Sequence, residues 1–168
     1  YSFTSKDISL FVICKKKMNF FNSGHNHDDN LSIDLVINNE AIITDPGSFC
    51  YTDDLKLRYL YRGYNAHFVP RTSGMLNQKI IQNPFYFFES YDGKCEYINK
   101  NIFLGSLKMQ DIIIYRYLEI KNEGLLIKDF CLNDRLINYS SLDQNLKISS
   151  SYGVLSKINM INKNKLRF

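Results

Sequence analysis

Three histidines are the residues of this sequence whose type and spacing could do chemistry. They are His25, His27 and His67, and they all lie in the stretch from Gly24 to His67. His25 and His27 are separated by one residue, and an extended segment would project both imidazoles to the same side. Asp45 lies between this pair and His67. The stretch therefore predicts a metal or catalytic centre.

The elements between the histidines are predicted to fold these side chains together. Residues 31–37 alternate between apolar and other side chains, the period of a half-buried strand. Asn38-Asn39-Glu40 is a turn sequence, and residues 41–44 would return as the partner strand. Asp45-Pro46-Gly47 ends that strand, since proline cannot continue a ladder. A hairpin of this kind brings Asp45 back beside His27, and the following loop can return His67 to the same place.

Two or three imidazoles with one carboxylate are a ligand set that zinc takes. Asp28 and Asp29 could accept hydrogen bonds from the ligating imidazoles. By spacing alone, His25 would be a fourth ligand and the site a closed structural one. The alternative is that Asp45 is only a turn residue and that the histidines are surface residues. The concentration of all the histidines in one stretch favours the centre.

Arg58 and Arg62 are the candidates to meet a carboxylate of a ligand, because guanidinium pairs with carboxylate through two parallel hydrogen bonds. They lie in residues 52–64, which we expect to be a loop with one helical turn. A solvated, charged loop is the alternative. Tyrosines in the same segment could stack on a ring of a ligand or simply pack in the core.

The remainder of the chain has the patterns of an all-β protein. Tyr and Phe are unusually frequent, with 12 of each, and such residues fit a pleated surface. Strands are predicted over residues 8–13, 85–91, 95–98, 111–120 and 125–132, and weaker ones over 146–148 and 154–161. An Asp92-Gly93 turn would join the second and third of these. We expect an antiparallel β-sandwich forming one domain over residues 1–168.

Charge and cysteine usage exclude several classes of protein. The net charge of +4 is mild and scattered, which argues against a nucleic-acid partner. The four cysteines form no CxxC pair and are expected to be free thiols. No apolar run approaches the ~20 residues that a membrane-spanning helix needs.

The histidine stretch also resembles a known family. G-H-N-H-D-D-N-L-S, beginning at Gly24, resembles the G-H-x-H-x-D-x-L-S signature of the heparinase II/III-like polysaccharide lyases. D-P-G-S at Asp45 with the later Tyr51-Thr52 is similar to that family's D-P-G-[TS]…Y-T segment. The family's later run of arginines and A-H has counterparts in the expected order, at Arg58, Arg62-Gly63 and Ala66-His67. The strand patterns of residues 115–117 and 125–129 resemble later strands of the same domain.

This resemblance implies a two-part enzyme, with an N-terminal α/α toroid followed by a β-sandwich that this chain would supply. It implies a zinc or similar metal held by His27, Asp45 and His67, and a catalytic role for His25. The chemistry would be β-elimination at a uronic acid, in which a base removes the proton α to the carboxyl group and the 4-linked leaving oxygen is protonated. Other catalytic groups would lie in the toroid, so this chain alone is expected to be inactive.

The expected partners are an anionic, uronic-acid-containing polysaccharide, such as a glycosaminoglycan, and the toroid of the same protein. A periplasmic or secreted location is expected, with a cytoplasmic one as the alternative. Two other functions stay open. One is a non-catalytic carbohydrate-binding or structural sandwich whose metal staples loops, and the other is a metal-dependent hydrolase with a two-histidine, one-carboxylate site.

Overall fold

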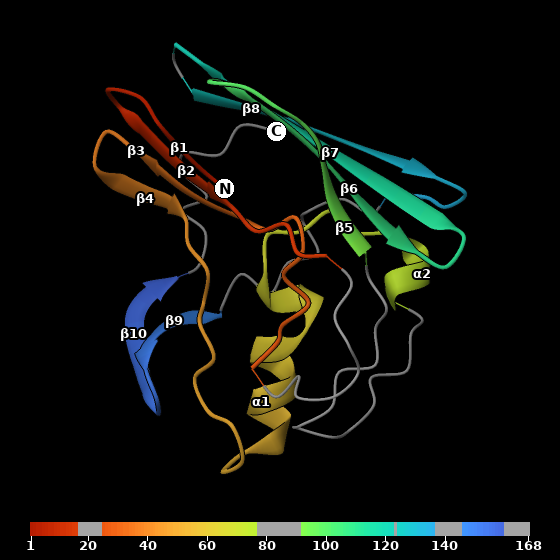
Figure 1. Cartoon of the computed structure of the whole chain (residues 1–168). Helices are drawn as coiled ribbons and strands as arrows, with labels where there is room; N and C mark the ends of the chain where they lie inside the picture. Colours follow the sequence, from red (N-terminus) through yellow and green to blue (C-terminus); the bar gives the residue numbers. More distant parts are fainter. Residues whose placement is uncertain (17–24, 77–91, 123, 137–145, 160–168) are drawn as a thin grey trace.

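Two four-stranded antiparallel sheets form the body of the protein. The computed structural model describes residues 1–16, 25–76, 92–122, 124–136 and 146–159 (Figure 1). The first sheet has the order β1 (Ser2–Thr4), β2 (Ile8–Val12), β3 (Ile33–Ile37), β4 (Glu40–Ile43). The second has the order β5 (Asp92–Ile98), β6 (Ile102–Met109), β7 (Ile112–Lys121), β8 (Gly124–Leu132).

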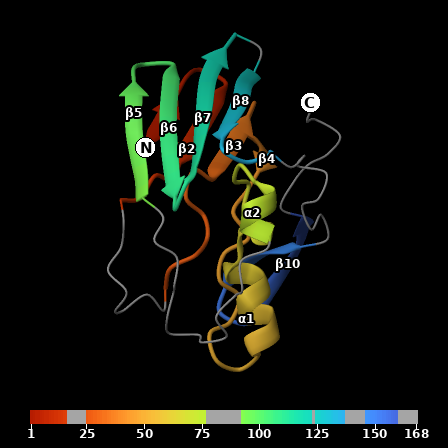
Figure 2. The same ribbon diagram turned by 90° about the vertical axis from the view of Figure 1, so that its right-hand side faces the viewer.

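The core lies between the two sheets, which face one another in Figures 1 and 2. Leu10 on β2 is buried, as are Ile114 and Leu118 on β7, as the period-two alternation of each strand requires. The rings of Phe3 and Phe103 meet edge to face across the sheets, with centroids 6.5 Å apart. These contacts confirm the antiparallel β-sandwich.

The remaining elements lie beyond one end of the sandwich (Figure 2). They are helix α1 (Leu55–Arg62), the 3₁₀ helix η1 (Tyr64–Ala66), helix α2 (Ser73–Leu76), and the antiparallel hairpin of β9 (Lys147–Ser151) and β10 (Val154–Asn159). Asp54 begins α1 by accepting a hydrogen bond from the Leu57 backbone nitrogen at 2.9 Å.

The hairpin that frames the histidine stretch is confirmed. β3 pairs with β4, and Asn38 and Asn39 both have positive φ, as the tight turn between them requires. The predicted pairing of β7 with β8 is also confirmed. The expectation of a loop with one helical turn over residues 52–64 was wrong, because α1 has eight residues there. The predicted strand at 85–91 and residues 160–161 lie outside the described residues.

The predicted Asp92-Gly93 turn was wrong, since both residues belong to β5. The partner of β5 is β6, a strand that the sequence did not indicate. Glycine is required at position 93 by the close approach of the segment that follows β2, rather than by a turn. Its nitrogen donates to the Lys15 carbonyl oxygen at 2.9 Å, and a Cβ at this position would lie 2.4 Å from that oxygen.

The four cysteines are free thiols, as predicted, with Cys50 buried and the other three half-buried. Among the described residues, no helix has the length and apolar character needed to cross a membrane.

Candidate metal and catalytic site

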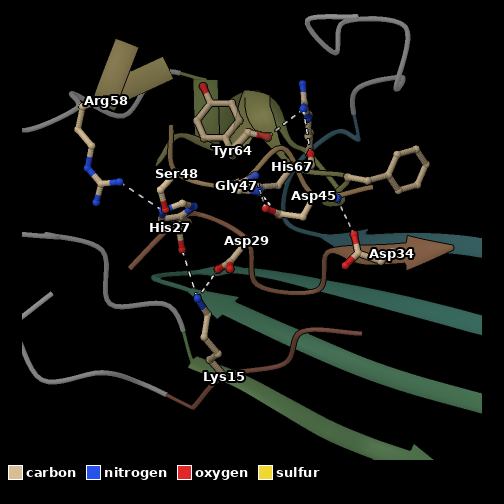
Figure 3. Close-up of polar contacts among 12 residues, drawn as sticks. Lys15, His27, Asp29, Asp34, Asp45, Gly47, Ser48, Arg58, Tyr64 and His67 are labelled. Atoms are coloured by element: carbon tan, nitrogen blue, oxygen red, sulfur yellow. Dashed lines mark hydrogen bonds and ion pairs between the residues drawn. The ribbon is translucent and has the colours of Figure 1, made fainter. Parts of the chain in front are cut away.

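The loop that carries His25 and His27 is tied down on both sides. On one side, Arg62 of α1 donates from Nε to the Asn26 carbonyl oxygen at 2.9 Å, and its own carbonyl accepts from the Asp28 nitrogen at 2.9 Å. On the other side, Lys15 forms an ion pair with Asp29 (Figure 3). The loop is therefore fixed between α1 and the segment that follows β2.

Asp45 lies two residues after the end of β4. Its nitrogen donates to Oδ1 of Asp34 on β3 at 2.6 Å, and its own Oδ1 accepts from the Gly47 nitrogen at 2.8 Å. His67, which follows η1, is fully buried, and its Nδ1 lies 2.6 Å from Oδ2 of Asp45 (Figure 3). The burial of Asp45 would raise the pKa of its carboxyl group, but the hydrogen bond and charge of His67 outweigh this and lower it.

His27 lies against the same pair. Its ring centroid is 5.2 Å from that of His67, and its Nε2 lies 3.1 Å from Ser48 Oγ and 3.4 Å from Arg58 Nη1. Because a guanidinium can only donate, this nitrogen is an acceptor and carries no proton. Burial, followed by the neighbouring charges of His67 and Arg58, lowers the pKa of His27 to about 3. His27 is thus a neutral imidazole, the form that binds metals.

The structure therefore brings His27, Asp45 and His67 together, as the spacing predicted. Their donor chemistry fits a divalent metal: two imidazoles, an ionised carboxylate, and a buried His67 Nε2 with no hydrogen-bond partner among the described residues. Within those residues, however, no group of three or more His, Cys, Asp or Glu side chains is arranged to hold a metal ion. The ligand set stays a prediction.

His25 lies at the exposed side of the cluster and contacts a different residue. Its Nδ1 is 3.2 Å from the hydroxyl of Tyr51, and the two rings meet edge to face at 5.2 Å. His25 is exposed, whereas His67 is fully buried. This position leaves the imidazole open to a ligand in solvent, and the catalytic role of His25 stays a prediction.

Arg58 and Arg62 are both buried on α1, so the alternative of a solvated loop was wrong. The Arg58 guanidinium lies 4.7 Å above the Tyr51 ring and beside His27. Arg62 holds the histidine loop, as described above. Both residues contact the histidine loop, Arg58 at His27 and Arg62 at Asn26. Their predicted contact with a substrate carboxylate is untested.

A buried ion pair of the second sheet also reaches the site. Arg116 on β7 is fully buried and makes two 2.9 Å bonds to the carboxylate of Asp129 on β8. Its Nη1 donates to the carbonyl oxygens of Leu31 at 2.7 Å and Phe68 at 2.5 Å. The Arg116–Asp129 pair thus joins the end of the histidine loop to the residue after His67. A sequence signal existed, because period-two alternation places Arg116 in phase with the core positions of β7.

The β9–β10 hairpin covers the D-P-G-S segment. The Ser149 nitrogen donates to the Pro46 carbonyl oxygen at 2.7 Å, and the Gly153 nitrogen to that of Phe49 at 2.7 Å. The Tyr61 hydroxyl of α1 donates to the Lys147 carbonyl oxygen at 2.9 Å. Nothing in the sequence indicated this docking, because the weak strand pattern of the hairpin does not show which segment it packs against.

Fold and site together define a class: an antiparallel β-sandwich with a buried His–Asp cluster at one end. Residues 1–68 match the family model described as Heparinase II/III-like, C-terminal. The match spans the whole histidine stretch and confirms the resemblance of its motifs to that family. No curated protein and no solved structure gave a match.

Proposed function

We propose that this chain is the β-sandwich domain of a polysaccharide lyase that cleaves a uronic-acid-containing polymer by β-elimination. The observation that carries the proposal is the meeting of His27, Asp45 and His67, with His67 Nδ1 2.6 Å from Asp45 Oδ2. This meeting lies within the part of the chain that matches the lyase family model. A periplasmic or secreted location, where such polymers occur, is part of the proposal.

In this proposal His27, Asp45 and His67 hold a divalent metal, zinc by preference. The donor set supports it, since His27 is neutral and Asp45 is held ionised. A bound metal would supply positive charge to neutralise the substrate carboxylate. Coordination would replace the present contacts of these side chains, because they already hydrogen-bond to one another and to Ser48 and Arg58.

His25 is proposed to contact the sugar. An exposed imidazole held by Tyr51 at 3.2 Å can donate or accept a proton at the rim of the cluster. In the reaction, the proton at C5 of the uronate passes to a base and the C4–O bond breaks. The leaving oxygen takes up a proton, and a C4–C5 double bond remains. The base and the remaining groups would come from the proposed toroid.

The test uses the full-length protein with heparan sulfate and with alginate. A lyase generates ultraviolet absorbance from the new C4–C5 double bond, and a His25→Ala variant should lose it while keeping its fold. New reducing ends without that absorbance would identify a hydrolase and overturn the proposal. Binding without any cleavage would instead identify a non-catalytic carbohydrate-binding sandwich.

A further inference from the structure

Two tyrosines form a parallel pair beside His25, and one of them comes from the C-terminal hairpin. The rings of Tyr51 and Tyr152 are inclined by only 7°, with centroids 6.0 Å apart. Tyr152 lies at the turn between β9 and β10, far in sequence from the residues that match the family model. The pair lies next to His25, because Nδ1 of His25 is 3.2 Å from the Tyr51 hydroxyl.

The Tyr152 ring is accessible although its backbone is fixed. Tyr152 is 54% exposed. The backbone nitrogen of the next residue, Gly153, donates a hydrogen bond to the Phe49 carbonyl oxygen. The Tyr152 hydroxyl donates to the carboxylate of Asp53. A side chain that is held in place before binding loses little conformational entropy when a ligand packs against it.

An exposed, fixed aromatic face is suited to a sugar ring. The face of an aromatic ring carries partial negative charge, and the C–H groups on one side of a pyranose carry partial positive charge. The neighbouring Asp53 is exposed and carries a carboxylate. This charge disfavours a uronate at the same position and favours a sugar that has no acid group.

We propose that Tyr152, stacked on Tyr51, forms a subsite for a sugar residue without a carboxylate, next to the residue bound at His25. The inference rests on the proposed function, since it assigns a second position on the same polymer chain. It predicts a polymer in which uronic acids alternate with sugars that carry no carboxylate, rather than one made only of uronic acids.

The experiment measures the binding of the full-length protein to immobilised heparan sulfate, which contains hexosamines, and to alginate, which contains only uronates. Tyr152→Ala should weaken binding to heparan sulfate by roughly three- to tenfold, the range expected for losing one aromatic contact. Tyr152→Phe keeps the ring and should bind within about twofold of the unmodified protein. Tyr97→Ala, which removes an exposed tyrosine of β5 outside the cluster, is the matched control.

Three results would overturn the subsite: no loss of binding in Tyr152→Ala, an equal loss in Tyr97→Ala, or tighter binding of alginate than of heparan sulfate. The subsite and the lyase reaction can fail separately. Binding that depends on Tyr152 without any unsaturated product would reject only the reaction. Unsaturated product formed with an unchanged KM in Tyr152→Ala would reject only the subsite.

Discussion

Arg116 Nη1 lies 2.5 Å from the carbonyl oxygen of Phe68, the residue that follows His67. The same nitrogen bonds the Leu31 carbonyl oxygen at the end of the histidine loop, so one buried guanidinium of the second sheet holds both segments. Its charge is matched by Asp129 on the neighbouring strand. The second sheet therefore contributes to the geometry of a cluster whose own residues all lie in the first 68.

Removing one partner of this pair should be strongly destabilising. Arg116→Met would leave the Asp129 carboxylate buried without its cation and two carbonyl oxygens without their donor. We expect the free energy of unfolding to fall by about 3–5 kcal/mol, as found for broken buried ion pairs. Denaturant titration measures this change. Lys94→Ala, which breaks an exposed pair with Glu96, should lower the free energy of unfolding far less, and equal losses in the two variants would contradict the buried role.

The burial of Arg116 could be predicted from the sequence, but its partner Asp129 could not. A charged residue in phase with Ile114 and Leu118 predicts burial, and burial predicts a partner. The identity of that partner depended on the register of β7 against β8, which sets Arg116 opposite Asp129. The contacts with Leu31 and Phe68 depended on how the two sheets stack, which no local pattern encodes.

The hairpin before Asp45 could be predicted because, unlike the contacts of Arg116, it depends on local sequence alone. Its turn residues and alternation are local, so β3, β4 and the return of Asp45 toward His27 followed from the sequence. The β9–β10 hairpin was not predictable as part of the site. It docks on the backbone carbonyl groups of Pro46 and Phe49 and on the Tyr61 hydroxyl, and no local pattern shows that these groups meet β9 and β10.

The proposed ligand set can be tested one histidine at a time. His27→Ala and His67→Ala should each lose bound metal, and Asp45→Asn should lose most of it, because each removes one donor. His25→Ala should keep its metal, since His25 contacts Tyr51 rather than the buried pair. Elemental analysis after dialysis gives the metal content, and the fall in Tm on adding a chelator gives an independent measure. Equal metal loss in all three histidine variants would favour a closed site in which His25 is a fourth ligand.

The metal-free protein should lose stability as the pH falls from about 6.5 toward 3. The pKa of His27 is lowered to about 3 in the folded state, against about 6.5 when unfolded. The unfolded state therefore binds more protons at this residue within the window, so the contribution of His27 to stability rises with pH there and is constant above it. The slope from one such group is at most about 1.4 kcal/mol per pH unit.

His27→Gln isolates this contribution. The variant should show a shallower decline in unfolding free energy between pH 6.5 and 4, measured by denaturant titration in the presence of a chelator. Asp34, whose pKa is raised by burial, titrates in both proteins and does not account for a difference between them. Identical pH profiles would mean that His27 is as easily protonated in the folded protein as in the unfolded chain.

Gly47 and Gly153 offer a matched pair for testing the docked hairpin. Both have left-handed backbone conformations, with φ of +75° and +70°. A Cβ at Gly47 would lie 2.7 Å from the Ser149 carbonyl oxygen, whereas one at Gly153 would meet nothing within 4 Å. Gly153→Ala should therefore show only the backbone strain of about 1 kcal/mol. Gly47→Ala should lose that amount and a further ~1–3 kcal/mol, because β9 must move away.

The same two variants report on the site. Displacing β9 in Gly47→Ala should also withdraw Tyr152 from Tyr51, so binding to heparan sulfate should weaken as in Tyr152→Ala. Gly153→Ala, with open space around its new methyl group, should bind more tightly than Gly47→Ala. Equal stability and equal binding in the two variants would show that β9 does not press on the D-P-G-S segment in solution.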